Sequence, residues 1–327
     1  MLKYFLVLLS LSVSINTWAC DLCNIYLNME PNDLGSSMGF NYRYRLFQNK
    51  QTNYNTVSSN LKHAIGNTVI ADANIQEEIF NSYDLWLNYF FYEKWQLYGN
   101  ISFTDNYYKE DDSVMVNVAG IGDLTLLAKY IAFNTKATDS SDWKFRLSIG
   151  GGIQVPIGQY NKTYVVSPSS SAKGNVVYGA PYEELDPHMQ AGSGSWDVLL
   201  VAEGLSRYKN VGISTNITYQ VNTANSNQFK FANRLNLNAN AFYLAQIKKF
   251  TLAPNLGISY ESSPRDEFRG DDYLNSGGKA LFLSSGVKFY FKKFALGATY
   301  FKPIRQSLYD NQLNNKLRTT VDLTYYF

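Results

Sequence analysis

Several segments of the chain alternate between apolar and polar residues. Basic and acidic residues recur at the polar positions of these segments. Alternation of this kind places side chains on one face of a β-strand, so these charges would share the inner surface of a closed barrel. Two interpretations stay open: the opposite charges pair and brace the wall, or they form a constriction that selects permeants. In the second interpretation the basic excess favours anionic or zwitterionic solutes. The set comprises Arg43, Arg45, Asp84, Lys144, Arg146, Asp197, Glu203, Arg234, Lys288, Arg318 and Asp322.

The two cysteines form a Cys-x-x-Cys motif, with Cys20 and Cys23 close to the start of the chain. Three interpretations are open: a local disulfide or plain dithiol, a metal site, or a lipid anchor on Cys20. A zinc site takes four ligands, of which this motif supplies only two. Thr17 stands where a lipidation signal usually has Leu, which disfavours the third interpretation. No other cofactor is indicated.

The two histidines, His63 and His188, are the residues on which a serine hydrolase would depend, because its nucleophile needs a base within reach. Both fall in predicted external loops, and neither sits on a strand beside an outward-facing serine. His188 precedes Met189, and this pair is only weak support for a soft-metal site. The chain has no phosphate-binding loop, zinc-protease motif or dinucleotide fingerprint. We therefore expect a protein that is not an enzyme.

The composition suits strands that face lipid. The chain contains 26 Tyr and 20 Phe, and 45% of its residues are hydrophobic, yet its mean hydropathy is -0.25. Aromatic side chains favour strands and form the two interfacial belts of membrane barrels. The formal net charge of +2 indicates neither nucleic acid nor an acidic membrane surface as a partner.

Period-two alternation dominates the chain and is clearest from 211 to 221, where Val211, Ile213 and Ile217 face one side and Ser214 the other. Runs of this length suit a tilted strand that crosses the hydrocarbon, which takes about nine to eleven residues. Lipid permits no open sheet edge, so we predict an all-β, antiparallel transmembrane β-barrel of about 12 strands. Strands are expected near 38–48, 77–91, 95–108, 121–133, 143–157, 195–206, 210–221, 230–245, 250–261, 279–290, 294–302 and 316–327.

The predicted connections alternate between short turns and longer polar loops, which is typical of outer-membrane barrels whose short turns face the periplasm. The longer loops include 109–120 and 303–315, and the longest is 158–194. A loop of that length is usually a lid, a binding loop or a disordered segment. An even number of strands places both termini in the periplasm. The last strand ends in Phe327, which resembles the terminal signal that the outer-membrane assembly machinery recognises.

The first residues have the features of a signal peptide: Lys3 gives a positive start, an apolar run follows, and the small residue Ala19 offers a cleavage site. We therefore divide the chain into residues 1–19 as a signal peptide, 20–37 as an N-terminal segment with the cysteine motif, and 38–327 as the barrel. The segment 20–37 is interpreted either as a periplasmic tail or as a plug in the lumen.

Three stretches carry a family resemblance. They are Gly120-Ile121-Gly122-Asp123-Leu124 running into Leu127-Ala128-Lys129-Tyr130, then Gly150-Gly151-Gly152-Ile153-Gln154-Val155-Pro156-Ile157-Gly158, and Gln190-Ala191-Gly192-Ser193-Gly194-Ser195-Trp196-Asp197. In order and spacing they resemble the outer-membrane transporter family of the MetA pathway of phenol degradation, over roughly residues 118–221. The resemblance implies a Gram-negative outer-membrane β-barrel that acts as a channel for small molecules, with hydrophobic or aromatic compounds as candidates.

These observations together predict an outer-membrane channel for the passive passage of small molecules, since no energy source is visible in the sequence. A structural or adhesive barrel that binds a partner through its external loops is the alternative, and a barrel lipid hydrolase is third. The expected partners are outer-membrane lipid, the assembly machinery and a small-molecule permeant, without nucleic acid.

Overall fold

A computed structural model describes residues 35–50, 75–92, 94–110, 113–135, 141–165 and 182–327. The expected signal peptide at 1–19, the motif of Cys20 and Cys23 and most of the segment 20–37 lie outside these described residues, as does His63. Within the described part of the chain, no helix is both long and apolar enough to cross a membrane.

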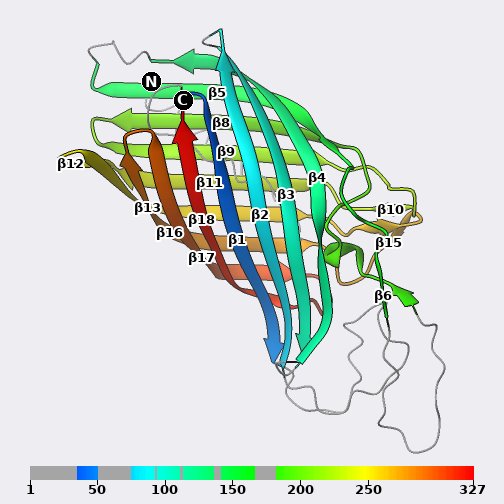
Figure 1. The fold of residues 1–327 in the computed structure, drawn as a ribbon. Helices are drawn as coiled ribbons and strands as arrows, with labels where there is room; N and C mark the ends of the chain where they lie inside the picture. The colour runs from blue at the N-terminus through cyan, green and yellow to red at the C-terminus, as the bar shows by residue number, and fades with distance from the viewer. Residues whose placement is uncertain (1–34, 51–74, 93, 111–112, 136–140, 166–181) are drawn as a thin grey trace, which may run out of the picture.

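Twelve long antiparallel strands close into a single barrel (Figure 1). β18 pairs with β1, from Tyr326 opposite Ser37 to Asn314 opposite Gln48, and this pairing closes the ring. Closure pairs the backbone N–H and C=O groups of the edge strands, which lipid could not hydrogen-bond. It confirms the predicted all-β antiparallel barrel of about 12 strands. In wall order the strands are β1 (Ser37–Lys50), β2 (Ile75–Phe91), β3 (Trp95–Glu110), β4 (Ser113–Asn134), β5 (Trp143–Val155), β8 (Asp197–Tyr208), β9 (Val211–Val221), β11 (Arg234–Tyr243), β13 (Phe250–Ser263), β16 (Gly278–Phe291), β17 (Phe294–Leu308) and β18 (Asn314–Tyr326).

Short elements complete the fold. β12 (Ala245–Ile247) follows β11 along the same edge of β13 and pairs with it. The remaining short elements lie in loops at the end of the barrel opposite β12. They are β6 (Thr163–Val165), β7 (Tyr182–Glu184), the 3-10 helix η1 (Pro187–Met189), β10 (Phe229–Lys230), β14 (Glu267–Phe268) and β15 (Asp271–Asp272).

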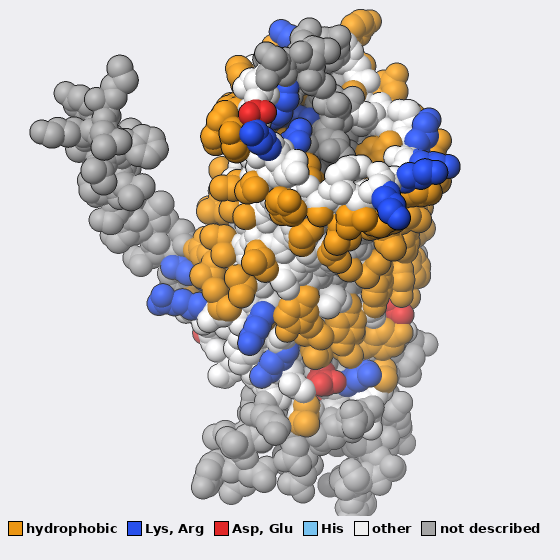
Figure 2. Space-filling view, turned by 90° about the vertical axis from the view of Figure 1, so that its left-hand side faces the viewer, with side chains coloured by type: hydrophobic (Ala, Val, Ile, Leu, Met, Phe, Trp, Pro, Cys, Tyr) orange, Lys and Arg blue, Asp and Glu red, His pale blue; other side chains and the backbone are white. Residues whose placement is uncertain are grey.

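The two faces of the wall differ as the alternation predicts. On β9 the side chains of Val211, Ile213 and Ile217 are exposed outward, whereas Ser214 and Thr218 are buried inward. Hydrophobic side chains cover most of the middle of the face in Figure 2, and charged side chains gather mainly toward its two ends. Such a surface requires a lipid environment, because exposing an apolar face of this extent to water would be unfavourable in free energy.

Aromatic rings lie near both borders of the apolar band. Trp95 contacts Tyr130 at one border, with ring centroids 5.2 Å apart, and Tyr83 contacts Phe103 at the other, with centroids 6.2 Å apart. Along β3 these borders are eight residues apart, about 27 Å of strand. Strand tilt reduces this to a height of about 20 Å, which is near the roughly 25 Å apolar band of membrane barrels.

The two ends of the barrel differ in their connections. At the turn end, strands are joined by tight turns such as Lys292 and Lys293 between β16 and β17. At the loop end, the longest described connection leads from Val155 to Asp197. The predicted loop 109–120 is wrong: β3 continues to Glu110 and β4 begins at Ser113, because alternation persists through this stretch and extends the hairpin. The predicted loop 303–315 is likewise shorter than expected.

Four strands, β1 to β4, rise beyond the aromatic border at the loop end and form what we call the raised wall. Its outward side chains include polar ones that bond across strands, as where Asn117 Nδ2 donates to Asp105 Oδ1 at 2.8 Å. Its inward side chains include an apolar set that forms a core with residues of the loops. That core comprises Phe47, Phe80, Tyr108, Val116 and Val118 from the wall, with Leu185, Met189 and Leu313.

Candidate functional site

The connection between β5 and β8 folds against the inner face of β4 and is tied there by one carboxylate. Asp123 Oδ1 accepts from the backbone N–H of Gly158 at 3.0 Å. Asp123 Oδ2 accepts from the N–H of Ser193 at 2.8 Å, from its Oγ at 2.7 Å and from Gln154 Nε2 at 2.9 Å. A single buried side chain thus fixes both ends of the connection, and hydrogen bonds to a charged acceptor are the stronger kind.

Two glycines make this attachment sterically feasible. A Cβ on Gly158 would lie 2.7 Å from Gly192 Cα, and a Cβ on Gly192 would lie 2.6 Å from the carbonyl carbon of Gly158. The two backbones therefore approach too closely for any side chain. The three stretches that carry the family resemblance meet at this point, since they contribute Asp123, Gly158 and Ser193 respectively.

The middle of the connection is held by the raised wall. Asn106 Nδ2, on β3, donates to the carbonyl of Met189 at 3.0 Å, and the Met189 side chain belongs to the apolar core described above. Lys162 Nζ donates to the carbonyl of Ala119 on β4. The described part of the connection therefore lies inside the mouth and not over it.

His188 joins this connection to the loop between β13 and β16. Its Nδ1 lies 2.9 Å from Asp186 Oδ1, and its Nε2 lies 2.7 Å from Asp266 Oδ2. Asp266 is fully buried, and its other oxygen accepts from the N–H of Ala232 at 2.7 Å. The cluster thus draws together three loops, of which the structure describes residues 156–165 with 182–196, 222–233 and 264–277. We name these described residues the cap.

Aromatic rings enclose His188. Phe231 and Tyr273 have ring centroids 5.7 Å and 6.2 Å from the imidazole, and Phe229 lies 5.0 Å from each of those two rings. Burial, with Asp186 nearby, raises the pKa of the Tyr273 phenol, so this hydroxyl stays protonated. His188 therefore lies among aromatic rings, with one carboxylate facing each ring nitrogen.

This geometry does not support His188 as a catalytic base. A hydrolytic histidine presents one nitrogen to an orienting carboxylate and the other to the nucleophile. Here Asp186 and Asp266 face the two nitrogens, which is the arrangement of a structural tie. Sequence reasoning considered His188 as a hydrolase base and as a weak metal ligand, and it missed the partners of this residue, because Asp266 lies 78 residues away in the chain.

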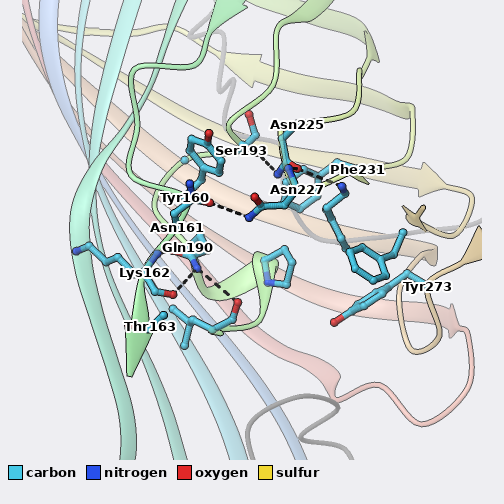
Figure 3. A pocket seen from close by; sticks show the side chains of 15 residues that line it. Tyr160, Asn161, Lys162, Thr163, Gln190, Ser193, Asn225, Asn227, Phe231 and Tyr273 are labelled. Atoms are coloured by element: carbon cyan, nitrogen blue, oxygen red, sulfur yellow. Dashed lines mark hydrogen bonds between the residues drawn. The ribbon is translucent and has the colours of Figure 1, made fainter. Parts of the chain in front are cut away.

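A cavity of about 390 Å³ opens within the cap, and we call it the outer cavity (Figure 3). Figure 3 shows Tyr273 on the side opposite Lys162, Thr163 and Gln190. Its volume lies in the range of small-molecule sites. The lining residues are Tyr160, Asn161, Lys162, Thr163, Leu185, Pro187, Gln190, Gly192, Ser193, Asn225, Asn227, Phe229, Phe231, Phe268 and Tyr273.

Polar side chains around the outer cavity are engaged in bonds between loop segments. Gln190 Nε2 donates to the carbonyl of Lys162 at 3.0 Å, and its Oε1 accepts from the Lys162 N–H at 3.2 Å. Asn225 Nδ2 donates to the carbonyl of Ser193 at 3.0 Å, and Asn227 Nδ2 donates to Asn161 Oδ1 at 2.8 Å. The amides hold the cavity in shape, which leaves the aromatic wall as the main surface offered to a ligand.

A second, inner cavity of about 30 Å³ lies beside the first. The two share Pro187, Gln190, Gly192, Ser193 and Phe231, so these residues form the partition between them. The inner cavity has room for about one or two waters. Its other lining residues come mostly from the barrel wall, with Ala191 and Asn222 from the cap: Asp123, Gln154, Ala191, Asp197, Gln220, Asn222 and Arg234.

Below the cap, ion pairs join charged side chains on the inner face of the wall. They link strands that lie one to three places apart along the wall, and most of the charged groups are buried. Breaking one partner of such a pair leaves an uncompensated charge. The pairs are Lys129 Nζ with Glu203 Oε1 at 2.8 Å, Arg43 Nη2 with Asp84 Oδ2 at 3.4 Å, Lys288 Nζ with Asp322 Oδ2 at 3.1 Å, and the Arg318 guanidinium with both Glu261 oxygens.

The other predicted lumen residues have different surroundings. Lys144 and Arg146 are half-buried on β5 near the turn end. Asp197 accepts from Ser195 Oγ at 2.9 Å and from the Thr223 N–H at 3.1 Å, at the base of the cap. Two arginines lie over aromatic rings, Arg45 over Phe80 at 5.0 Å and Arg234 over Phe231 at 5.2 Å.

Several inward charges were missed by sequence reasoning, and Lys129 and Glu261 are the two that form ion pairs in the lumen. A bulge in β4 turns both Gly122 and Asp123 inward, so the alternation changes phase and places Lys129 inside. Glu261 stands at the predicted end of its strand, where strand and loop are hard to separate. Among the described residues there is also no group of three or more His, Cys, Asp or Glu side chains that could hold a metal ion.

Comparison with solved structures shows the fold. An outer-membrane channel from Pseudomonas putida F1 superposes with a TM-score of 0.56 at 14% identity, covering 92% of this chain and 100% of that one. The β domain of the Bordetella autotransporter BrkA gives a TM-score of 0.49 at 11% identity, covering 90% of this chain and 100% of that one. Comparison with curated protein sequences finds no match.

Comparison with family models gives the assignment. The model described as "Putative MetA-pathway of phenol degradation" matches residues 58–307, which is most of the chain and includes all three stretches of the resemblance. The structure adds a closed barrel of twelve strands with an apolar outer face. The chain is therefore an outer-membrane β-barrel that belongs to the family of the MetA pathway of phenol degradation.

Proposed function

We propose that this protein is a passive outer-membrane channel for small ring compounds of the phenol type, which it takes up through the outer cavity. The observation that carries the proposal is the chemistry of that cavity, in which the amides of Gln190, Asn225 and Asn227 are occupied while aromatic rings form the free wall. Aromatic pairs gain about 0.5–1.5 kcal/mol beyond their buried area, which favours a planar ring as the ligand.

The route would continue from the outer to the inner cavity and then past the paired charges of the lumen. The inner cavity, at about 30 Å³, is too small for a ring compound. Passage therefore requires the partition that includes Gln190, Gly192 and Ser193 to move. That segment belongs to the connection held by Asp123 and His188, so these two attachments would set how often the route opens.

Orientation is part of the proposal. The loop end, with its cap and cavity, would face the outside, and the turn end would face the periplasm, as in other membrane barrels. Both chain termini would then be periplasmic. The charged pairs would serve mainly to brace the wall, and the energy for transport would come from the solute gradient alone.

The test is conductance of the purified protein in planar bilayers, with catechol added to the loop side. We expect steady single-channel conductance and transient block by catechol. Thr163→Trp should suppress the block, because Thr163 lines the outer cavity and an indole there would fill it without removing a side-chain hydrogen bond.

The matched control is Gln159→Trp, which places the same side chain on the same segment at an exposed position outside the cavity lining. This variant should be blocked by catechol like the original protein. Absence of conductance in every form would reject the channel. Conductance with equal block in both tryptophan variants would retain the channel and reject the outer cavity as its binding site.

A further inference from the structure

Four cations gather on the outer surface of three adjacent strands at the loop end: Lys279 on β16, Lys302 and Arg305 on β17, and Lys316 on β18. Lys302 stands opposite the outward-facing Leu283, and Arg305 opposite Leu281. Lys279 stands opposite Ser307, so Arg305 is its diagonal neighbour at about 7–8 Å, and Lys302 lies three residues from Arg305 on the same strand. The side chains therefore line one stretch of the outer surface, where a lipid with several anionic groups could meet them. We call this set the basic patch.

The height of the basic patch matches the border of the apolar band. On β17, Lys302 lies eight residues from Phe294, whose ring contacts Tyr325 at the turn-end aromatic border. The same spacing separates Trp95 from Phe103 on β3. Directly below the patch, Leu283 and Tyr300 are exposed and apolar. A ligand with an anionic head and apolar chains would meet both surfaces at once.

The patch has no internal acid to neutralise it. None of its four side chains takes part in an ion pair within the described ranges of the chain. Asp310, in the loop that follows β17, is bound to Arg265 at 3.0 Å. The raised wall differs at the corresponding height, because its outward groups include the carboxylates of Glu77 and Asp105.

We infer that the basic patch binds the phosphate groups of a phosphorylated lipid of the outer leaflet, of the lipid A type, whose acyl chains would lie on Leu283 and Tyr300. The charge is complementary, and each basic side chain near a membrane surface adds about 1 kcal/mol of attraction to anionic lipid. The inference rests on the proposed orientation in one respect, which is that the loop end must face the outer leaflet for the protein to meet this lipid in the cell. Binding of the lipid in detergent does not depend on the orientation.

The test uses the full-length protein in detergent, loaded with bis-phosphorylated lipid A, with retained lipid counted by native mass spectrometry. One variant combines Lys279→Gln, Lys302→Gln, Arg305→Gln and Lys316→Gln. The matched control carries the same number of neutralised cations at the turn end: Lys248→Gln, Lys249→Gln, Lys292→Gln and Lys293→Gln, all of which are exposed. Heat-modifiable migration on gels verifies that each variant is folded.

We expect the patch variant to lose at least fivefold in lipid A retention, and the control to retain it. Dephosphorylated lipid A should bind weakly and equally to all three proteins. Equal retention of lipid A by both variants would overturn the inference. Equal retention of phosphorylated and dephosphorylated lipid A would overturn it as well. Bilayer conductance of the patch variant should be unchanged, so failure of lipid binding and failure of the channel proposal would be told apart.

Discussion

The cap and the lumen bury polar groups in different ways. Within the cap and where it is attached to β4, single carboxylates bind segments that lie far apart in the chain. Asp123 is hydrogen-bonded to Ser193, 70 residues away, and Asp266 contacts His188, 78 residues away. In the lumen, charges pair side chain to side chain between strands, as Lys129 does with Glu203. We therefore expect the loss of a cap attachment to act locally and the loss of a lumen partner to destabilise the wall.

The largest expected effect is in the lumen. Glu203→Ala leaves Lys129 buried without its partner, which should lower the free energy of unfolding by about 3–5 kcal/mol. Replacing both, as Lys129→Met with Glu203→Leu, should restore most of that loss. Urea unfolding in detergent, followed by tryptophan fluorescence, measures both values. A single variant as stable as the original protein would show that the pair does not brace the wall.

A smaller effect, confined to the cap, is expected at Asp123. Asp123→Ala removes the acceptor of both loop ends and should lower the free energy of local opening by about 2–3 kcal/mol. Hydrogen exchange at Gly158 and Ser193 should then be about 30- to 150-fold faster. Mean bilayer conductance should rise. Strand amides of β9 serve as the internal reference, and equal acceleration there would mean that cap and wall do not open separately.

The smallest of these effects is expected at His188. His188→Gln keeps a polar side chain but loses the second carboxylate contact, which should cost about 1–2 kcal/mol of cap stability. Limited proteolysis within residues 182–196 should be faster by about tenfold. Arg269→Gln, at an exposed loop position, is the control and should be cleaved like the original protein. No difference between the two variants would remove His188 from the set of cap attachments.

The difference between the barrel wall and the cap also explains which features could be predicted from the sequence. Strands were predictable because period-two alternation is a local signal, and the inward placement of Arg43 or Asp322 follows from it. Its failure at Lys129 has a local cause, the phase change at Gly122 and Asp123. The cap was not predictable, because its partners meet only through the closed fold. The Gly-Asp and Gly-Ser-Gly stretches were visible as resemblance, but nothing in the sequence shows that they share one carboxylate.

The attachment of Gly158 and Gly192 at a single point has a consequence for how this protein can change in length. The chain enters and leaves this connection at one point, and doubling the length of a loop closed in this way costs only about 0.6 kcal/mol. Insertions between the two glycines that leave the attachments of Lys162, His188 and Met189 in place should therefore be tolerated while the barrel rim keeps its shape. The connection can thus lengthen without a change in the frame of the barrel.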